Sequence, residues 1–232
     1  MRKEVLAIGC ALMMLCGCGN NSAAQHYESG WAALEKKDYS TAEQEFQQVI
    51  DLDSRLAESY RAEGIAYYSE GAYPEAIAAF SRSLNNMDDP DKEFKKDVQF
   101  YLAQARMDYG EVDKAIEVYS EILKVGEDAQ AFFLRGKAYI SMDDYENAGK
   151  DFQRALKGCE DYNLYINIYQ IYVDNNKAVD GDAYLKMALE LEPQDGEDYY
   201  HRGRIYEYEK NYEAARDELK TSMEQGYEDA ML

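Results

Sequence analysis

The stretch GIAYYSEGAYPEAIAAFSRSL, residues 64–84, carries the pattern that decides the fold. Gly64 is followed three residues later by Tyr67, and Ala76 precedes Phe80 by four residues. Side chains at these spacings share one face of an α-helix. Two helices cross closely only where their side chains are small, so the glycine and the alanine let a hairpin close while the rings fill its sides. The stretch therefore predicts two helices that pack against each other.

The same pattern recurs along the chain with a period near 34 residues. Gly30 to Gly64 is 34 residues and Ala103 to Gly136 is 33, whereas Gly64 to Ala103 is 39 and breaks the period. The second half of the pattern, an alanine four residues before a large apolar residue, recurs at Ala42 and Phe46, Ala76 and Phe80, Ala115 and Tyr119, Ala148 and Phe152, and Ala215 and Leu219. The chain is thus built from repeated pairs of helices.

This repeat resembles the tetratricopeptide repeat (TPR) family, whose hairpins of about 34 residues carry small residues and aromatics at fixed places. The resemblance covers about residues 24–229. It implies an all-α fold, an α-solenoid of about six helix-turn-helix hairpins that form a right-handed superhelix. Because neighbouring hairpins bury each other's apolar faces, we expect one array over residues 24–232. The expected repeats are residues 24–56, 57–90, 96–128, 129–161, 162–195 and 196–229.

Some positions depart from the pattern. The fifth copy has Tyr169 where a small residue is usual and Gly181 where alanine is usual, and the third copy has Arg106 in place of tyrosine. The segment NNMDDPDKEFKKD at 85–97 is five residues longer than the period allows. Pro90 within it predicts an irregular connection, either a solvated loop or a partner contact.

Composition narrows the classes of partner. Of 232 residues, 46% are apolar and 31% are charged, which suits a folded core. The net charge is −21, from 25 basic and 46 acidic residues. Nucleic acid is therefore not expected as a partner, because phosphate binding needs a concentrated basic surface. The charge favours a basic partner or is a solvated acidic surface.

The N-terminus predicts export and a lipid anchor. Arg2 and Lys3 precede an apolar run from Val5 to Cys16 that contains no charge and is too short to span a bilayer, so residues 1–17 are expected to be a signal peptide. LCGC, residues 15–18, resembles the lipobox of bacterial lipoproteins, which implies a diacylglycerol on Cys18; Cys10 fits less well. Residues 18–23 form a short tether. The expected location is extracytoplasmic, anchored to the cell membrane or, where the source has two membranes, to the outer membrane.

An enzymatic role is not expected. Cys159 is the one cysteine after Cys18 and reads as a packing residue rather than a nucleophile. His26 and His201 lie in different repeats, and no catalytic or metal-ligand spacing is visible, so neither cofactor nor metal is expected.

The resemblance implies a concave groove lined by the first helices of successive hairpins, in which this chain would place aromatic and apolar side chains with scattered cations. The expected peptide-binding residues are Tyr27, Trp31, Arg61, Tyr68, Phe100, Gln104, Phe133, Lys137, Gln170, Tyr200, Arg204 and Tyr208.

Each of these residues has a structural alternative. Arg61, Lys137 and Arg204 suit a partner's carboxylate or pair with acids on neighbouring helices. Trp31 anchors a ligand or covers the first hairpin. At the level of the whole chain, we expect an interaction adaptor or assembly factor for an envelope protein, with capture of a glycan fragment as the alternative; an accessory subunit of an enzyme complex differs from the first only in its partner.

Overall fold

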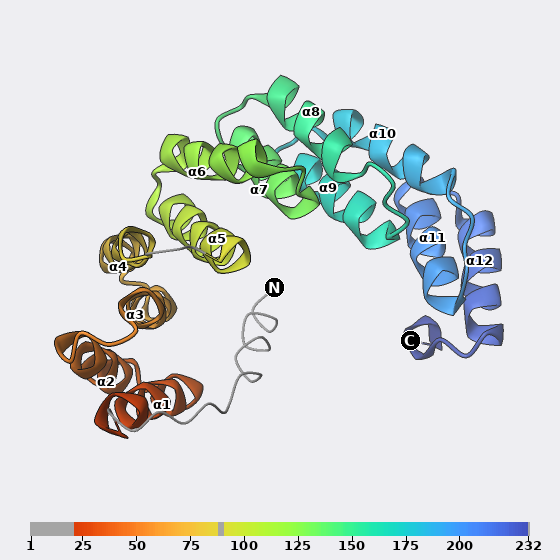
Figure 1. The fold of residues 1–232 in the computed structure, drawn as a ribbon. Coiled ribbons are helices and arrows are strands. Elements are labelled where there is room, and N and C mark those ends of the chain that lie inside the picture. The colour runs from red at the N-terminus through yellow and green to blue at the C-terminus, as the bar shows by residue number, and fades with distance from the viewer. Residues whose placement is uncertain (1–20, 88–90, 232) are drawn as a thin grey trace. The chain divides into compact units, whose positions relative to one another are not determined.

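The computed structural model describes residues 21–87 and 91–231. Over these residues the chain forms twelve α-helices and a short 3₁₀ helix, without any β-strand, which confirms the all-α expectation (Figure 1). The elements in chain order are α1 (Asn21–Glu35), α2 (Tyr39–Asp51), α3 (Leu56–Glu70), α4 (Tyr73–Asn85), α5 (Lys92–Tyr109), α6 (Val112–Val125), α7 (Ala129–Ser141), α8 (Tyr145–Ala155), α9 (Tyr162–Asp174), α10 (Ala178–Leu189), α11 (Gly196–Tyr208), α12 (Tyr212–Glu224) and η1 (Glu228–Met231).

The helices form six successive hairpins in two compact units. The first unit holds α1 to α4, and the second holds α5 to α12 with η1. Within the first unit α1 packs on α2, α2 on α3 and α3 on α4. In the second unit the two helices of every hairpin pack on each other, and α6 also packs on α7. This is the expected α-solenoid arrangement of paired helices.

The turn inside each hairpin has one recurring geometry. A single residue between the two helices adopts the left-handed conformation, which lets the chain reverse in very few residues. In three hairpins the next residue, Asp38, Asp144 or Asn211, caps the second helix by accepting a hydrogen bond from a backbone N–H three residues on. The left-handed residues are Lys37, Gly71, Gly110, Asp143, Asn176 and Lys210, with φ between 59° and 91°.

A glycine lies at the crossing of four hairpins, where the partner helix places a large side chain against it. A Cβ added at Gly64 would lie 2.6 Å from the Phe80 ring, and one added at Gly136 would lie 2.6 Å from the Phe152 ring. Gly30 faces Phe46, and Gly203 faces Leu219, in the same way. The sequence pattern of small and large residues thus marks real close approaches of backbone to ring.

The fifth hairpin reverses these roles. Its glycine, Gly181, lies on the second helix, α10, and a Cβ there would lie 2.9 Å from the Tyr172 Cβ and 3.1 Å from the Tyr169 ring on α9. The two departures noted in the sequence, Tyr169 and Gly181, are therefore one exchange. The ring has moved to the first helix and the small residue to the second.

Aromatic side chains dominate the cores. In the first unit Phe46 is fully buried among the alanines of α1 to α3. In the second unit Phe152 meets Tyr172 and Tyr184, with ring centroids 6.0 and 6.1 Å away, and the two tyrosines stack at 5.6 Å. Many of the 22 tyrosines are thus structural.

The N-terminal expectations lie mostly outside the described residues. The signal peptide 1–17 and the lipidation site Cys18 belong to that part of the chain, as does Pro90 of the long connection. The expected tether, 18–23, reaches into α1, which begins at Asn21. Among residues 21–87 and 91–231, no helix combines the length and apolar character that crossing a bilayer requires.

Candidate functional site

The expected groove residues fall into both units. Tyr27, Trp31, Arg61 and Tyr68 lie on α1 and α3 of the first unit, and the remaining eight lie on the first helices of the hairpins in the second unit. All twelve are partly buried, so each has packing contacts and some exposed surface.

In the first unit the aromatic candidates pack on the core. The rings of Tyr27 and Trp31 both approach the buried Phe46 edge-on, with centroids 5.8 Å away. The guanidinium of Arg55, in the loop before α3, lies over the outer face of Tyr27 at 4.2 Å. Trp31 therefore packs on the core of the first hairpin and keeps part of its ring exposed. Tyr68 lies 5.8 Å from Tyr73.

The glutamines among the candidates are engaged along their own helices. Gln104 donates a hydrogen bond to Asp108 at 3.2 Å, and Gln170 donates one to Asp174 at 2.8 Å. Such pairs four residues apart are ordinary features of a solvated helix surface. Of the two phenylalanines, Phe100 packs on Tyr119 and Phe133 packs on Phe152.

The C-terminal hairpins bring several candidates together. On α11, Tyr200, Arg204 and Tyr208 follow one another at intervals of four residues and share one face. Arg204 Nη2 donates to the Tyr208 hydroxyl at 3.2 Å, and its guanidinium carbon lies 5.9 Å from the Tyr200 ring centroid. Tyr208 in turn lies 5.1 Å from Tyr169 of α9. These four side chains are called the tyrosine–arginine ladder.

The ladder borders a shallow cavity and the C-terminal segment. The Tyr227 ring, between α12 and η1, lies 5.3 Å from the Tyr200 ring. Beside Tyr208, a cavity of about 490 Å³ is lined also by Asp182, Lys186, Glu209, Lys210 and Asn211. The sequence placed three of the four ladder residues in the groove; it treated Tyr169 only as a misfit at a small position.

Two candidate cations lack a counter-charge. Arg204 forms no ion pair with any described residue, and Lys137 has only the Phe133 ring, 5.9 Å from its Nζ. The alternative that these cations pair with neighbouring acids therefore fails for both of them. Arg61 is engaged within the molecule and is not part of this group.

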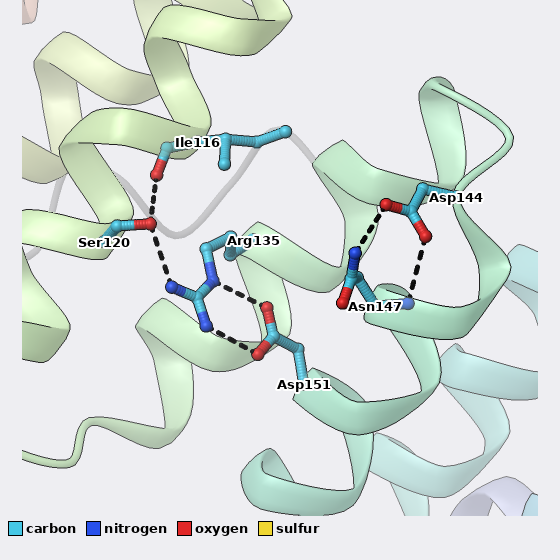
Figure 2. A network of polar contacts seen from close by, with 6 residues as sticks. All are labelled: Ile116, Ser120, Arg135, Asp144, Asn147 and Asp151. Atoms are coloured by element: carbon cyan, nitrogen blue, oxygen red, sulfur yellow. Dashed lines mark hydrogen bonds and ion pairs between the residues drawn. The ribbon is translucent and has the colours of Figure 1, made fainter.

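Other arginines show what the paired alternative looks like. Arg135 of α7 donates from Nε and Nη2 to the two carboxylate oxygens of Asp151 on α8, at 2.7 and 2.8 Å, and from Nη1 to the Ser120 hydroxyl at 2.9 Å (Figure 2). The sixth hairpin repeats the pair with Arg202 and Glu218, 2.6 Å apart. The carboxylate raises the pKa of Arg135. These pairs join the two helices of a hairpin.

A signal in the sequence marks both pairs, although neither was predicted. Each arginine directly precedes a crossing glycine, Gly136 or Gly203, and each carboxylate follows its arginine by 16 residues. An alignment of the repeats on their glycines therefore brings out both pairs.

The described residues hold no evident catalytic or metal centre. No group of three or more His, Cys, Asp or Glu side chains among them is placed to hold a metal ion. Burial raises the pKa of the Cys159 thiol, which disfavours the thiolate that a nucleophile needs. His26 contacts Glu45 at 2.7 Å, and His201 contacts Asn163 at 2.9 Å.

Comparison with known families agrees with the repeat geometry. The tetratricopeptide repeat matches residues 27–91 and 100–163, and a second TPR description matches residues 199–224. The chain belongs to the tetratricopeptide repeat family. TPR proteins typically act as scaffolds that bind protein partners, and the repeats support such an interaction or scaffold role for this chain.

Individual relatives of this TPR chain are distant. Superkiller protein 3 of Schizosaccharomyces pombe is 25% identical over 142 residues, which are 58% of this chain and 10% of that protein. The chain thus spans about a tenth of that relative's length.

Solved structures show the same TPR fold. A tetratricopeptide repeat protein from Parabacteroides merdae has a TM-score of 0.54 at 18% identity and is matched over 90% of this chain and 95% of its own. MamA has a TM-score of 0.59 at 19% identity, over 82% and 95%. MamA from Desulfovibrio magneticus has a TM-score of 0.61 at 16% identity, over 74% and 95%. At these identities the likeness shows the fold alone.

Proposed function

We propose that this TPR chain is a lipid-anchored adaptor of the bacterial cell envelope that binds a protein segment on the first helices of its hairpins. The tyrosine–arginine ladder is the proposed contact for an acidic side chain or a carboxyl terminus of that segment. The main support for this proposal is that the Arg204 guanidinium forms no ion pair with any described residue, although the protein is strongly acidic.

The chemistry of the ladder suits a carboxylate next to an apolar or aromatic side chain. A guanidinium has five N–H donors, and Arg204 uses one of them on the Tyr208 hydroxyl. The remaining donors fit the two oxygens of a carboxylate. The rings of Tyr200 and Tyr208 flank the charge and offer apolar surface on either side. Tyrosine and arginine are also the residue types that dominate binding energy at protein interfaces.

Glycan capture has less support from the side chains. Tyr162, Tyr165, Tyr172 and Tyr184 are at most 6% exposed, so their rings are closed to a sugar. The partly exposed ladder tyrosines would stack on a sugar without needing the Arg204 charge. The two readings therefore differ in how strongly binding depends on that charge.

The test uses the full-length chain in detergent with envelope extract from the source bacterium. Cross-linking and mass spectrometry identify the bound segment, and a synthetic peptide of it is then titrated against purified protein. Arg204→Gln should weaken the peptide by about 10- to 100-fold, as expected for a lost charge-assisted hydrogen bond of about 1.5–3 kcal/mol. Arg216→Gln, an exposed arginine of α12 that contacts Asp217, makes the same charge change and should leave the affinity unaltered.

Equal affinity for wild type and Arg204→Gln, with both still folded by circular dichroism, would remove the ladder from the binding site. If the protein retains glycan fragments rather than a protein, and Arg204→Gln does not weaken that binding, glycan capture would be favoured.

The membrane anchor at Cys18 is part of the same proposal, supported by the lipobox-like LCGC, residues 15–18. The full-length chain made in a bacterial host should start at a diacylglyceryl-modified Cys18 and sediment with membranes, as read by mass spectrometry of the N-terminal peptide. Cys18→Ala should abolish the modification, and Cys10→Ala should not. An unmodified N-terminus, or a lipid on Cys10, would refute this assignment.

A further inference from the structure

The first unit contains an acidic pocket that is separate from the ladder. Between α2 and α3 lies a cavity of about 480 Å³, called here the Glu63 pocket and lined by Glu43, Gln44, Glu45, Gln47, Gln48, Glu63 and Tyr67. Gln44 and Gln48 are exposed and form its mouth, whereas Glu63 is buried. The pocket therefore leads from solvent to a carboxylate.

Glu63 is a buried acid without a partner. Its side chain is 4% exposed, and it makes no hydrogen bond or ion pair with any described residue. Burial of an ionised carboxylate is costly unless an opposite charge or hydrogen-bond donors compensate it. Such an acid is neutralised by a proton or is balanced by a cation that enters the open cavity from outside the chain.

The other repeats show which partner is missing. Glu63 directly precedes Gly64, the place that Arg135 and Arg202 occupy in the fourth and sixth hairpins. There the arginine pairs with a carboxylate 16 residues later, whereas the second hairpin has Ala79 at that place. The second hairpin thus has an acid, Glu63, at the position of the arginine, and at the position of the pairing residue it has an uncharged alanine.

The charged residues that line the Glu63 pocket are all acidic. Glu43 of α2 has one carboxylate oxygen, Oε1, buried without a hydrogen-bond partner. Glu45 of α2 is already contacted by His26 of α1. Of the groups on α4, Arg82 attracts Glu63 but forms no ion pair with it. Tyr67 of α3 lies near both Glu63 and Glu43. Two more acids, Glu70 of α3 and Glu75 of α4, lie near Glu43.

We propose that the Glu63 pocket receives the ammonium or guanidinium group of a lysine or arginine side chain from a basic segment of a partner protein. Glu63 and Glu43 supply the negative charge, and the amide oxygens of Gln44 and Gln48 supply neutral acceptors at the mouth. Tyr67 offers a ring against which the aliphatic stem or the cation packs. Because this site lies on α2 and α3, it stands independently of the ladder on α11.

Protonation provides a direct readout. Burial raises the pKa of Glu63 to about 7; nearby Arg82 opposes this rise and nearby Glu43 adds to it. Burial, together with Glu70 and Glu75, also raises the pKa of Glu43. A cation that enters the pocket stabilises the ionised form and lowers the pKa of Glu63 again, by one unit or more for a charge within about 4–6 Å.

The experiment follows the Glu63 side-chain carboxyl ¹³C signal of the full-length chain through a pH titration, with and without the peptide acetyl-Gly-Arg-Gly-amide in millimolar excess. The expected result is a fall of about one unit or more in the pKa of Glu63. The matched peptide with citrulline, which is neutral, should leave it unchanged, and the exposed Glu28 should report no shift with either peptide. An unchanged pKa of Glu63 with the arginine peptide, at concentrations that saturate any millimolar site, overturns the proposal.

Two further measurements separate a loss of binding from misfolding and distinguish a polypeptide cation from a free polyamine. Glu63→Gln should abolish the arginine-specific binding while the protein stays folded, and Glu28→Gln, with the same charge change on α1, should not. Spermidine tests a free polyamine: a shift of the Glu63 pKa with spermidine but not with the arginine peptide or its lysine counterpart would overturn a polypeptide occupant.

Discussion

Arg135 and Asp151 join the two helices of the fourth hairpin by a pair of parallel hydrogen bonds, 2.7 and 2.8 Å long, and both side chains are largely buried. Removal of one partner leaves the other charge buried and unpaired, which is more costly than the loss of the pair itself. The pair therefore sets a stability test that separates these two effects.

Arg135→Met should lower the free energy of unfolding by about 3–5 kcal/mol, because Asp151 remains buried without its partner. The double variant Arg135→Met/Asp151→Leu should recover most of that loss. Urea denaturation followed by circular dichroism measures both. Lys150→Met breaks an exposed pair with Glu146 and should change stability by less than about 1 kcal/mol. A double variant as unstable as the single one would contradict this account.

The crossing at Gly64 predicts a steric penalty. Gly64→Leu forces a side chain into the Phe80 ring, since even a Cβ would lie 2.6 Å from it. The expected loss in the free energy of unfolding is about 1–3 kcal/mol, and it is smaller the further α3 can shift away from α4. Thermal melting measures the loss, and an unchanged midpoint would argue against the crossing.

A matched control for this test is Gly149→Ala on α8. A Cβ at Gly149 meets nothing closer than two tyrosine hydroxyls at 3.8 Å. This substitution should stabilise the protein by up to about 1 kcal/mol, because alanine has the higher helix propensity.

Burial of Glu63 predicts a pH-dependent stability. Its pKa in the folded chain, about 7, lies above the usual 4.5, so the fold favours the protonated form. The stabilisation of that form is complete below the unfolded pKa and is lost as pH rises through 7. Wild type should therefore match Glu63→Gln near pH 4 and fall below it by about 3 kcal/mol near pH 8, since 2.5 units correspond to roughly that free energy.

Urea unfolding of both variants across this range measures the difference. A difference that is constant with pH would exclude Glu63 as its cause.

The left-handed turn residues predict opposite effects for two glycine exchanges. Gly71 has φ 91°, so Gly71→Ala should destabilise the α3–α4 turn by about 1 kcal/mol. Lys210 has φ 61° in the matching turn of the sixth hairpin, so Lys210→Gly should be neutral or stabilising by a few tenths of a kcal/mol. Thermal melting of the two variants checks the signs, and a stabilising Gly71→Ala would contradict the left-handed assignment.

Much of the fold could be predicted because the residues that pack at each helix crossing recur in every repeat. Gly64, Ala76 and Phe80 recur at fixed spacing, and the helices lie where that spacing places them. The exchange in the fifth hairpin was harder to predict. Tyr169 and Gly181 each look like a separate exception in the sequence, and only their contact shows that one compensates the other.

The candidate site was predicted less completely, for a physical reason. A helix position indicates which way a side chain points, but its charge balance depends on neighbours from other helices. Lys137, Arg135 and Arg204 lie on equivalent helices, yet only Arg135 is paired. Glu63 escaped notice in the same way, because its burial and its missing partner are properties of α2, α3 and α4 together.

The exchange between α9 and α10 also constrains how this array can change by recombination. In the hairpins with a glycine on the first helix, the first helix always carries the small residue and the second helix the large one. A genetic crossover within one of their turns therefore still pairs a small residue with a large one. A crossover in the turn after α9 would set Tyr169 against a second helix that already carries a large ring. The two halves of the fifth hairpin must therefore be inherited together, whereas the four hairpins with a glycine on the first helix can exchange halves with one another.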